Sequence, residues 1–583
     1  MAQLDFVNTG DTPAGTEPVD PLAQDIIKRQ GMLERHRTVW ETTWREIAMR
    51  LSPQEQIFFY GTPGNMGAGM TIEQARMTAG IRQDLYQYDA SPAGAWQKYG
   101  AVLHSITIPK GARWHGFKPV SPELAKDINV RRYCDDFTDL LFAVRYSGRS
   151  GFDSAAFSAF LSNGLYGHGW LFIEDRLSKG IGYCNIHMSQ IYPIENHFGE
   201  IDRIHRKYQL TAEQAIEKWG DSGKLPGIIK KAMANVSTQD KLFTFIHAVY
   251  PNRSRDVSRR DWLGMPYVAH DVCIESKTLI GSGGFRIFPY AVARSVTLPQ
   301  QTYSLSPAFL CLADIKTLNE MMKTSLRFAQ LTLDPPLMLR DMDSLAPWQM
   351  RPGYLNKGYL DEDGKPAVVG LEIKGDPRFA AEVVKEKRDI IASSFYNTLF
   401  DILVQSPEMT ATQALIRSQE KGALLAPVAS RLEPEFLNAI ISREAQILQD
   451  AGAAPKPPDV LLAHGGGLKI EYDSPLTQAQ KSQAGAGILQ TMQAAAQMAT
   501  FDPNVKFRIN WDKAIQELAT VYSCPAHVIA SDQEYQAALL QQQQLEQSAM
   551  AQQAALPMSQ AVKNVGQAQA AFGRNQPSQA QQL

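Results

Sequence analysis

The segment Asp314-Ile-Lys-Thr-Leu-Asn319 opens the stretch that decides the fold of this chain, and Arg327-Phe-Ala-Gln-Leu-Thr-Leu-Asp334-Pro335-Pro336 closes its first part. From residue 307 to residue 333, apolar residues recur every three or four positions, which predicts one apolar face of a long helix. The helix is expected to stop at the two prolines, because proline lacks an N–H donor and disfavours helical backbone in the residue before it. The apolar face consists of Leu312, Ile315, Leu318, Met322, Leu326, Ala329 and Leu333.

A small excursion and a second helix follow the prolines. Residues 334 to 378 place prolines and an Asp-Gly turn between short apolar runs, which favours a β-rich segment. Residues 379 to 400 combine many charges with apolar positions at Ile390, Ile391 and Phe395, so a second helix is expected there. Two helices that flank a short excursion must lie roughly antiparallel, with the excursion held at one end.

A loop and a third long helix complete this part of the chain. Gln405-Ser-Pro-Glu-Met409 is expected to be a loop, and Thr410 can cap a helix over residues 411 to 448 that Pro427 and Pro434 should bend. A single copy would leave the first two helices poorly covered. Copies packed side by side around a ring would bury the apolar faces against their neighbours and turn the charged faces to a lumen or to solvent.

The rest of the sequence indicates a mixed α+β protein. Short runs broken by glycine and proline predict strands, and residues 60 to 300 are expected to form a single α+β domain. Gly281-Ser-Gly283-Gly284 lacks the spacing of a dinucleotide-binding loop and predicts a hairpin turn. From residue 536 the chain is rich in Gln and Ala, which favours solvated helix or disorder. Helices are expected at 21 to 51 and 93 to 105, and strands within 166 to 206 and at 242 to 250, 267 to 275, 278 to 288 and 468 to 472.

Composition narrows the class of protein. The 583 residues carry a formal net charge of −2, so any contact with nucleic acid must be local. Five widely spaced cysteines with no C-x-x-C pair argue against a disulfide framework and against a thiolate zinc site. We expect no membrane span and no secretory signal, since neither a long apolar run nor a basic and apolar leader is present.

Catalytic motifs lack the context that they require. His464-Gly-Gly-Gly467 resembles the oxyanion loop of some esterases, yet the sequence has no G-x-S-x-G nucleophile elbow, so we expect a turn. No phosphate-binding loop and no H-E-x-x-H pair occurs, which predicts a protein without enzymatic activity, cofactor or metal. A hydrolase-like processing enzyme that uses the His464 loop remains the alternative from a different class. The histidines His168, His187, His197 and His205 are too scattered to name as metal ligands.

The succession of helix, excursion, helix, loop and bent helix resembles the head-to-tail connecting (portal) proteins of podoviruses, the short-tailed, T7-like bacteriophages. In that family an Asp-Ile-Lys-x-Leu-Asn helix ends at Asp-Pro-Pro, as at Asp314 and Asp334 here. Where the family usually has Arg-Trp and then Tyr-Gly-x-Ser-Pro, this chain has Arg294-Ser295 and Tyr303-Ser-Leu-Ser-Pro307. Further matches in the same order are Ala95-Trp96-Gln97, Leu103-His-Ser105, Arg351-Pro-Gly353, residues 388 to 395, Pro407-Glu-Met-Thr-Ala-Thr412, Gln419-Glu-Lys421, Glu471-Tyr-Asp-Ser-Pro475 and Cys524-Pro525-Ala526.

The resemblance implies an α+β portal fold with an α/β wing, a two-helix stem, a small β-rich clip and a helical crown, assembled as a dodecameric ring at one capsid vertex. The implied parts are an N-terminal arm and helix (1–59), the wing (60–306), the stem helices (307–333 and 379–400), the clip (334–378), a channel loop (401–411), a long wing helix with linker (412–467), the crown (468–535) and the tail (536–583). A non-portal neck or scaffold protein, the second alternative, should lack the paired stem helices and the clip between them.

The resemblance also implies a role and partners. The ring would conduct double-stranded DNA during packaging and ejection, and would meet the terminase large subunit, the tail adaptors, and the major capsid and scaffolding proteins. It would be assembled in the host cytoplasm and kept in the virion. A conduit should carry few positive charges, since each cation paired with a phosphate adds friction.

Two groups of residues are the candidate sites. For the DNA channel they are Ser406, Pro407, Glu408 and Met409 in the loop, with Lys316, Lys323, Arg327, Lys385, Lys387 and Arg388 on the stem helices. A solvated or salt-bridged helix face would explain each of the six cations equally well. For the clip and its partners the candidates are Trp348, Arg351, Tyr354, Lys357 and Tyr359.

Overall fold

The chain divides into two compact units, which we describe one at a time. The first comprises Met1–His115, Thr138–Ala454 and Tyr472–Ala479, and the second comprises Gly116–Phe137, Pro455–Glu471 and Gln480–Leu583. The computed structural model describes residues 20–55, 87–176, 180–220, 224–235, 238–333, 337–339, 368–370, 377–397, 431–465 and 467–472, with short pieces at 487–495, 497, 514–515, 518 and 535–547.

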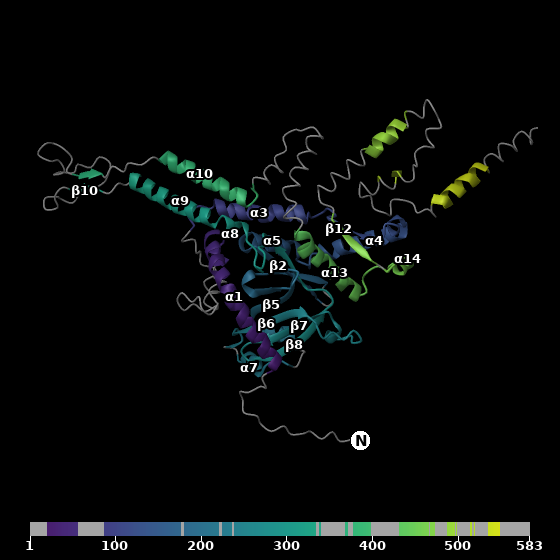
Figure 1. The fold of residues 1–583 in the computed structure, drawn as a ribbon, viewed down its shortest axis with the longest axis horizontal. Coiled ribbons are helices and arrows are strands. Elements are labelled where there is room, and N and C mark those ends of the chain that lie inside the picture. Colours follow the sequence, from purple (N-terminus) through teal and green to yellow (C-terminus); the bar gives the residue numbers. More distant parts are fainter. Residues whose placement is uncertain are drawn as a thin grey trace, which may run out of the picture. The chain divides into compact units, whose positions relative to one another are not determined.

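A five-stranded antiparallel sheet forms the centre of the first unit (Figure 1), in the order β4-β5-β6-β7-β8. Alternate residues of β6 point to opposite faces, so Phe243 and Phe245 lie on one face while Ile246 and Ala248 lie on the other. The strands are β4 (Ile191–Glu195), β5 (Ile201–Thr211), β6 (Leu242–Pro251), β7 (Tyr267–Cys273) and β8 (Thr278–Phe285).

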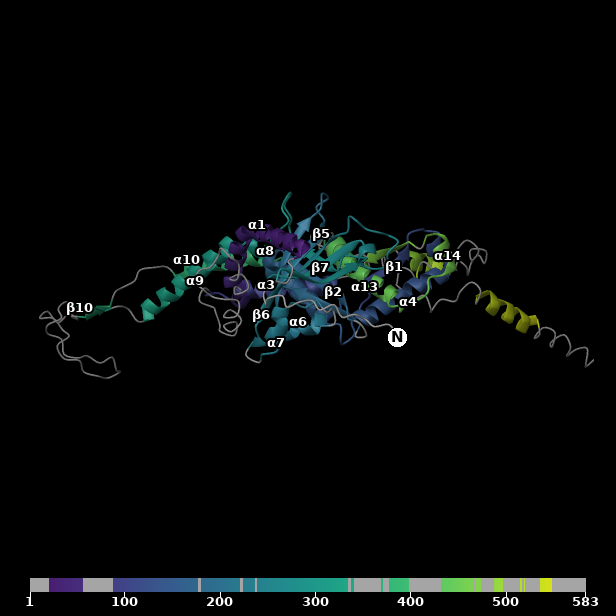
Figure 2. The same ribbon diagram turned by 90° about the horizontal axis from the view of Figure 1, so that it is seen from below.

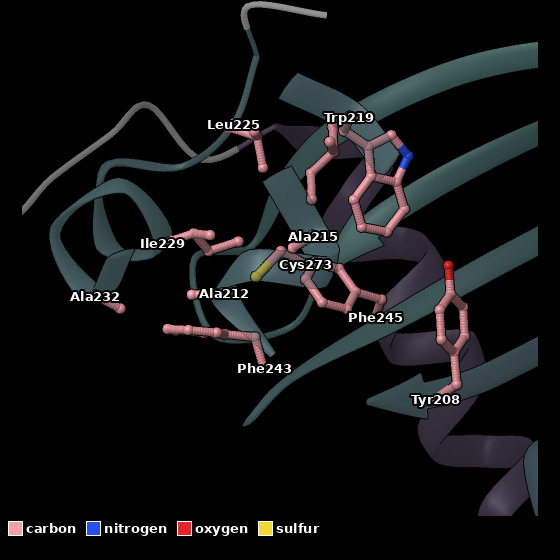
Figure 3. Close-up of a cluster of buried hydrophobic side chains, with 11 residues drawn as sticks. Tyr208, Ala212, Ala215, Trp219, Leu225, Ile229, Ala232, Phe243, Phe245 and Cys273 are labelled. Carbon is pink, nitrogen blue, oxygen red and sulfur yellow. The ribbon is translucent and has the colours of Figure 1, made fainter. Parts of the chain in front are cut away.

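Helices cover both faces of this sheet. On the face of Phe243 and Phe245 lie α6 (Ala212–Trp219) and α7 (Gly227–Met233), which contribute Trp219 and Ile229 to a buried cluster (Figure 3). The opposite face packs against Ala23 and Ile26 of α1 (Pro21–Leu51). Burial on both faces accounts for the mostly apolar sequence of β6.

The glycines of β8 correct one expectation. Residues 281 to 284 were expected to form a hairpin turn, yet they lie inside the strand, where Gly281 pairs with Asp271 and Gly284 with Val268. A side chain at Gly284 would come within 2.8 Å of Met265. Close packing of the β6–β7 connection on the strand therefore explains this glycine better than turn geometry does.

A smaller sheet, in the order β3-β2-β9, packs beside helix α5 (Phe152–Tyr166). Gly167, at the end of α5, has a φ of +78°, and a side chain there would collide with the backbone of Ser304. This glycine allows the chain to turn directly from α5 into β2. The strands are β2 (His168–Asp175), β3 (Ile181–Ile186) and β9 (Tyr290–Arg294).

Buried ion pairs fix α13 (Asn438–Asp450) and the π-helical turn before it, η7 (Glu433–Leu437), to this body. Arg145, fully buried at the end of α4 (Ile128–Arg145), donates from Nε to Glu444 Oε1 at 3.0 Å. Arg294 of β9 binds Glu435 at 2.6 Å. Pro434 lies in the π-helical turn, so the helix is irregular where its proline was expected to bend it.

A histidine completes the Arg145 pair. Nη1 of Arg145 lies 2.8 Å from Nε2 of His115. Burial and then the adjacent guanidinium hold the pKa of His115 well below its ordinary value, so the ring is neutral and accepts this hydrogen bond. Breaking such a buried pair is costly, because the remaining charge would be left without compensation.

The second unit contains the described strand pair of β1 (His115–Pro119) and β12 (Leu468–Tyr472), with the short helix α14 (Asp459–Ala463). Its core joins Val130, Tyr133 and Cys134 to Leu461. The sequence predicted a single domain over residues 60 to 300, whereas residues 116–137 pack with residues 455–471. Pairing over more than 300 residues leaves no local pattern in the sequence, which is why it was not foreseen.

The described helices include none that is both long and apolar enough to cross a lipid bilayer.

Candidate functional site: the paired helices α9 and α10

Two helices project together from the first unit, one on each side of the expected excursion. Figure 1 and Figure 2 show α9 (Leu312–Leu333) and α10 (Pro377–Ser394) side by side. They run antiparallel, because Lys387 contacts Asp314 near the body while Ala380 lies beside Met321 and Thr324 further out. This confirms two neighbouring helices in the region that decides the fold.

The first helix is divided rather than continuous from residue 307. α8 (Pro307–Leu310) is capped by Ser306, whose Oγ accepts from Phe309 N at 2.9 Å and donates to Leu165 O at 2.7 Å. Cys311 then leaves the helical backbone region, and α9 starts one residue later. The expected single helix is therefore wrong at Cys311, where α8 is held by the body and α9 departs from it.

The second helix ends earlier than residue 400. α10 stops at Ser394, and Tyr396 adopts a φ of 57°, which a helix cannot continue. Asn397, which is buried, donates from Nδ2 to Ala95 O of α3 (Ser91–Thr107) at 3.1 Å. The anchoring of Asn397 to α3 explains why the chain turns here although the sequence pattern continues.

The described part of the excursion is a strand pair. β10 (Leu337–Leu339) and β11 (Val368–Gly370) are antiparallel, with Leu337 opposite Gly370. The two strands follow α9 and precede α10, as a β-rich excursion between two helices requires.

Polar contacts hold the base of the pair. Asn319, which is buried, accepts from the backbone N–H groups of Tyr88 and Asp89 at 2.9 and 3.2 Å. Arg388 of α10 donates to Asp89 Oδ2 at 3.0 Å from Nε and at 2.8 Å from Nη2. Lys387 donates to Asp314 at 2.8 Å. The segment before α3 thus binds both helices.

The electrostatics of Asp89 follow from these contacts. Burial alone would raise the pKa of this carboxyl, but hydrogen bonds from Ser91 and from Arg388 outweigh it and hold the pKa below its ordinary value. Asp89 is therefore an anion at neutral pH and a partner for Arg388. No local pattern predicts this role, because Asp89 lies 299 residues away from Arg388 along the chain.

Burial changes along α9. Near the body, Ile315 and Leu318 have no exposed surface. Further out, Leu326 is 48% exposed, Leu331 is 42% exposed and Leu333 is 87% exposed. The apolar face identified in the sequence is thus covered by the chain itself only over its first half.

An open depression lies between the two helices. Four of its seven lining residues have short side chains, namely Thr317, Thr324, Ser325 and Ala380. The lining residues are Lys316, Thr317, Glu320, Met321, Thr324, Ser325 and Ala380.

The six candidate cations of the helices fall into two groups. Lys316 pairs with Glu46, Lys387 with Asp314, Arg388 with Asp89 and Lys323 with Glu320. Arg327 and Lys385 are exposed, and within the described residues neither forms an ion pair. The geometry therefore gives four of the cations a partner in the same chain, and leaves Arg327 and Lys385 as the charges available to another molecule.

The other candidate residues lie outside the described residues. These are the loop residues Ser406, Pro407, Glu408 and Met409 and the clip residues Trp348, Arg351, Tyr354, Lys357 and Tyr359.

The alternative catalytic site receives no support from the geometry. His464 is exposed, and its Nδ1 lies 3.0 Å from the carbonyl of Val460 in the preceding turn. The ring therefore caps its own short helix. Among the described residues, no group of three His, Cys, Asp or Glu side chains is placed to hold a metal ion.

The first unit is thus an α+β body that carries two projecting helices with a strand pair between them, and the outer part of one apolar helix face is exposed. The chain belongs to the family of bacteriophage head to tail connecting proteins, whose model matches residues 23–529. This confirms the resemblance drawn from the sequence, and it places the chain in a family of connectors that are components of the virion.

Two relatives are similar over almost their whole length. The chain is 25% identical over 524 residues to the portal protein of Salmonella phage epsilon15, with 88% of this chain and 89% of the relative covered. It is 23% identical over 537 residues to the probable portal protein of Bordetella phage BPP-1, with 91% and 92% covered.

The one departure from the family pattern has a structural setting. Arg294 is buried and bound by Glu195 at 2.5 Å and by Glu435. Ser295, which stands where the family usually has tryptophan, donates from Oγ to Asn163 Oδ1 at 2.8 Å. The arginine therefore keeps a bridging position, while its neighbour satisfies a buried amide.

Proposed function

We propose that this chain is the portal subunit of a podovirus, twelve copies of which form a ring at one vertex of the capsid. The ring serves as the channel through which the viral DNA is packaged and ejected. It is also the docking site for the terminase large subunit during packaging and for tail adaptor proteins afterwards, and it sits among the major capsid and scaffolding proteins. Family membership over most of the chain and the names of both relatives support this proposal.

One observation carries the proposal: the outer half of α9 exposes Leu326, Leu331 and Leu333. Leu326 and Leu333 lie seven residues apart on one face of this helix, and apolar residues at such a spacing are usually buried. In a ring, each subunit presents one surface to the neighbour on one side and a different surface to the neighbour on the other. The open depression between α9 and α10 is the surface to which we assign the neighbour's outer helix face.

The parts of the chain follow the family order. We assign residues 60–306 to the wing, 307–333 and 379–400 to the stem, 334–378 to the clip, 401–411 to the channel loop and 412–467 to the long wing helix with its linker. Residues 1–59 are the N-terminal arm and helix, 468–535 the crown and 536–583 the tail. In this assignment α9 and α10 are the stem helices, and β10 and β11 belong to the clip.

The charge of the stem suits a conduit. Since four of its cations are neutralised within the chain, DNA would meet few positive charges, and Arg327 and Lys385 are the stem residues that we assign to DNA contact. Ser406 to Met409 are assigned to the channel loop. The clip residues Trp348, Arg351, Tyr354, Lys357 and Tyr359 are assigned to partner contacts.

The proposed role is mechanical and not enzymatic. A hydrolase would need a nucleophile or carboxylate against His464, and this ring is instead bonded to a backbone carbonyl. A neck or scaffold protein without paired stem helices would not account for α9 and α10.

Electron microscopy of the purified protein tests the proposal. We expect closed rings with a central hole and twelvefold symmetry. Images that show only monomers or dimers, at concentrations where relatives of this family assemble, would contradict it.

A further inference from the structure

The connection between β6 and β7 is an ordered loop with an unusual density of arginine. Residues 252 to 264 hold four arginines among 13 residues, whereas the whole chain has 58 lysines and arginines in 583. This is about three times the average density, and it occurs in a protein with a net charge of −2. The arginines are Arg253, Arg255, Arg259 and Arg260.

Side-chain hydrogen bonds fix the shape of this loop. Asn252 donates from Nδ2 to Leu263 O at 2.8 Å and to Met265 O at 3.1 Å, which closes the loop at its base. Arg255 donates from Nε to Gly264 O at 2.9 Å. Because the backbone is already ordered, a ligand would not have to supply the entropy of ordering it.

The acidic groups of the loop are engaged inside it. Asp261 accepts from Arg259 at 3.1 Å and 2.5 Å, and Asp256 accepts from the backbone and hydroxyl groups of Ser258 at 3.0 and 2.6 Å. Arg253 and Arg260 are exposed and, within the part of the chain that the structure describes, make no hydrogen bond or ion pair. The loop therefore presents guanidinium groups without an internal counter-ion.

We propose that the loop of residues 252 to 264 binds the phosphate backbone of double-stranded DNA, at a place separate from α9 and α10. Guanidinium groups match phosphate oxygens by paired hydrogen bonds, and all four cations of the loop are arginine rather than lysine. The loop exposes one large apolar side chain, Val257, and a single exposed valine is too little for the apolar centre of a protein interface. The inference rests on the proposed function, because a portal subunit is expected to contact the DNA that passes through the ring.

The test measures binding of a fluorescent 30-base-pair duplex of arbitrary sequence to the full-length protein over a range of NaCl concentrations. For Arg253→Gln with Arg260→Gln, we expect at least about tenfold weaker binding at 50 mM NaCl. The slope of log K against log salt should fall by about 1 to 2, since each phosphate contact contributes roughly 0.9. Lys230→Gln with Lys231→Gln is the matched control, because it removes two exposed cations of α7 in the same unit.

A second variant tests the shape of the loop rather than its charge. Asn252→Ala keeps every arginine but removes the two bonds that close the base, and we expect duplex binding to weaken several-fold with an unchanged salt slope. A cooperative thermal unfolding transition, measured for each variant, serves as the control that the variant is folded.

Two results would overturn the inference. One is equal duplex affinity for the wild type and for the Arg253 and Arg260 variant. The other is tighter binding of fluorescent poly-L-glutamate than of the duplex, with loss of that binding in the same variant, which would assign the loop to an acidic protein. Electron microscopy tests the proposed function separately. The absence of rings would count against the portal function, whereas an unchanged duplex affinity of the variant would count against DNA binding by the loop.

Discussion

The inner and outer halves of α9 share an apolar repeat but differ in their surroundings. Around Ile315, Leu318 and Asn319, α9 is buried against the body and bonded to it. Around Leu326 to Leu333 the apolar repeat continues, but Leu326 is 48% exposed and Leu333 is 87% exposed. The inner half is therefore part of the fold of one subunit, and the outer half is where a subunit depends on its neighbours.

The first way to test this comparison uses two leucines of one helix. Leu318→Ala removes a fully buried side chain and should lower the free energy of unfolding of the subunit by about 2–5 kcal/mol. Leu326→Ala, eight residues further on, should change it by less than about 0.5 kcal/mol when the subunit is dilute. Urea unfolding of both variants at low and high protein concentration measures the difference.

Concentration separates the two effects, since assembly stabilises the folded subunit by mass action. The decrease in unfolding free energy caused by Leu318→Ala should be the same at all protein concentrations. A destabilisation by Leu326→Ala should emerge only where rings form, and a large loss in dilute solution would mean that the outer half belongs to the core of the subunit.

A smaller effect is expected from Asp89 at the base of the pair. Its pKa is lowered in the folded protein, so its stabilising effect is fully present above the unfolded value of about 3.9 and is lost as the pH falls through the lower folded value. Because Arg388 is 45% exposed, the ion pair should contribute only about 0.2–1 kcal/mol. The gap in unfolding free energy between wild type and Asp89→Asn should narrow between pH 6 and pH 2.

Asp25→Asn is the control for this experiment, because that carboxylate is exposed on α1 and, among the described residues, forms its ion pair with the exposed Lys28. Its unfolding free energy should stay within about 0.5 kcal/mol of the wild type at every pH. An Asp89→Asn gap that grows as the pH falls would show that the carboxylate does not stabilise the base of the pair.

The smallest effect concerns the two exposed cations of the outer surface. Arg327→Gln with Lys385→Gln should leave subunit stability within about 0.5 kcal/mol, since neither side chain has a partner among the described residues. The double variant should instead change the rate of DNA packaging or ejection. Lys316→Gln is the comparison, and it should have less effect on DNA movement because Lys316 is already paired with Glu46.

The sequence predicted those parts of the fold that depend on local periodicity. The helices α1 and α3 and the strand β12 lie within about two residues of where the sequence placed them, and α9 and α10 lie in the predicted places with ends that differ by up to six residues. What it could not predict depends on distant partners. The pairing of β1 with β12, the buried pair of Arg145 with Glu444, and the contact of Asp89 with Arg388 join residues about 300 or more positions apart.

The helix boundaries show the same limit at a smaller scale. Apolar spacing continues through Cys311 and past Ser394, yet the helical backbone is interrupted at Cys311 and ends at Ser394, shortly before Asn397 bonds to Ala95. Similarly, the periodicity of α9 identified an apolar face but not which half of it the chain would cover. Only the packed structure separates Leu318 from Leu326.

The mass of the assembled particle tests the central claim most directly. Native mass spectrometry of the wild type should show a species of about 776 kDa, twelve times 64.7 kDa, while Leu331→Asp with Leu333→Asp should show mainly folded single subunits. Rings of unchanged mass and abundance in that variant, or a wild type that stays monomeric, would contradict the assignment of the outer half of α9 to the ring interface.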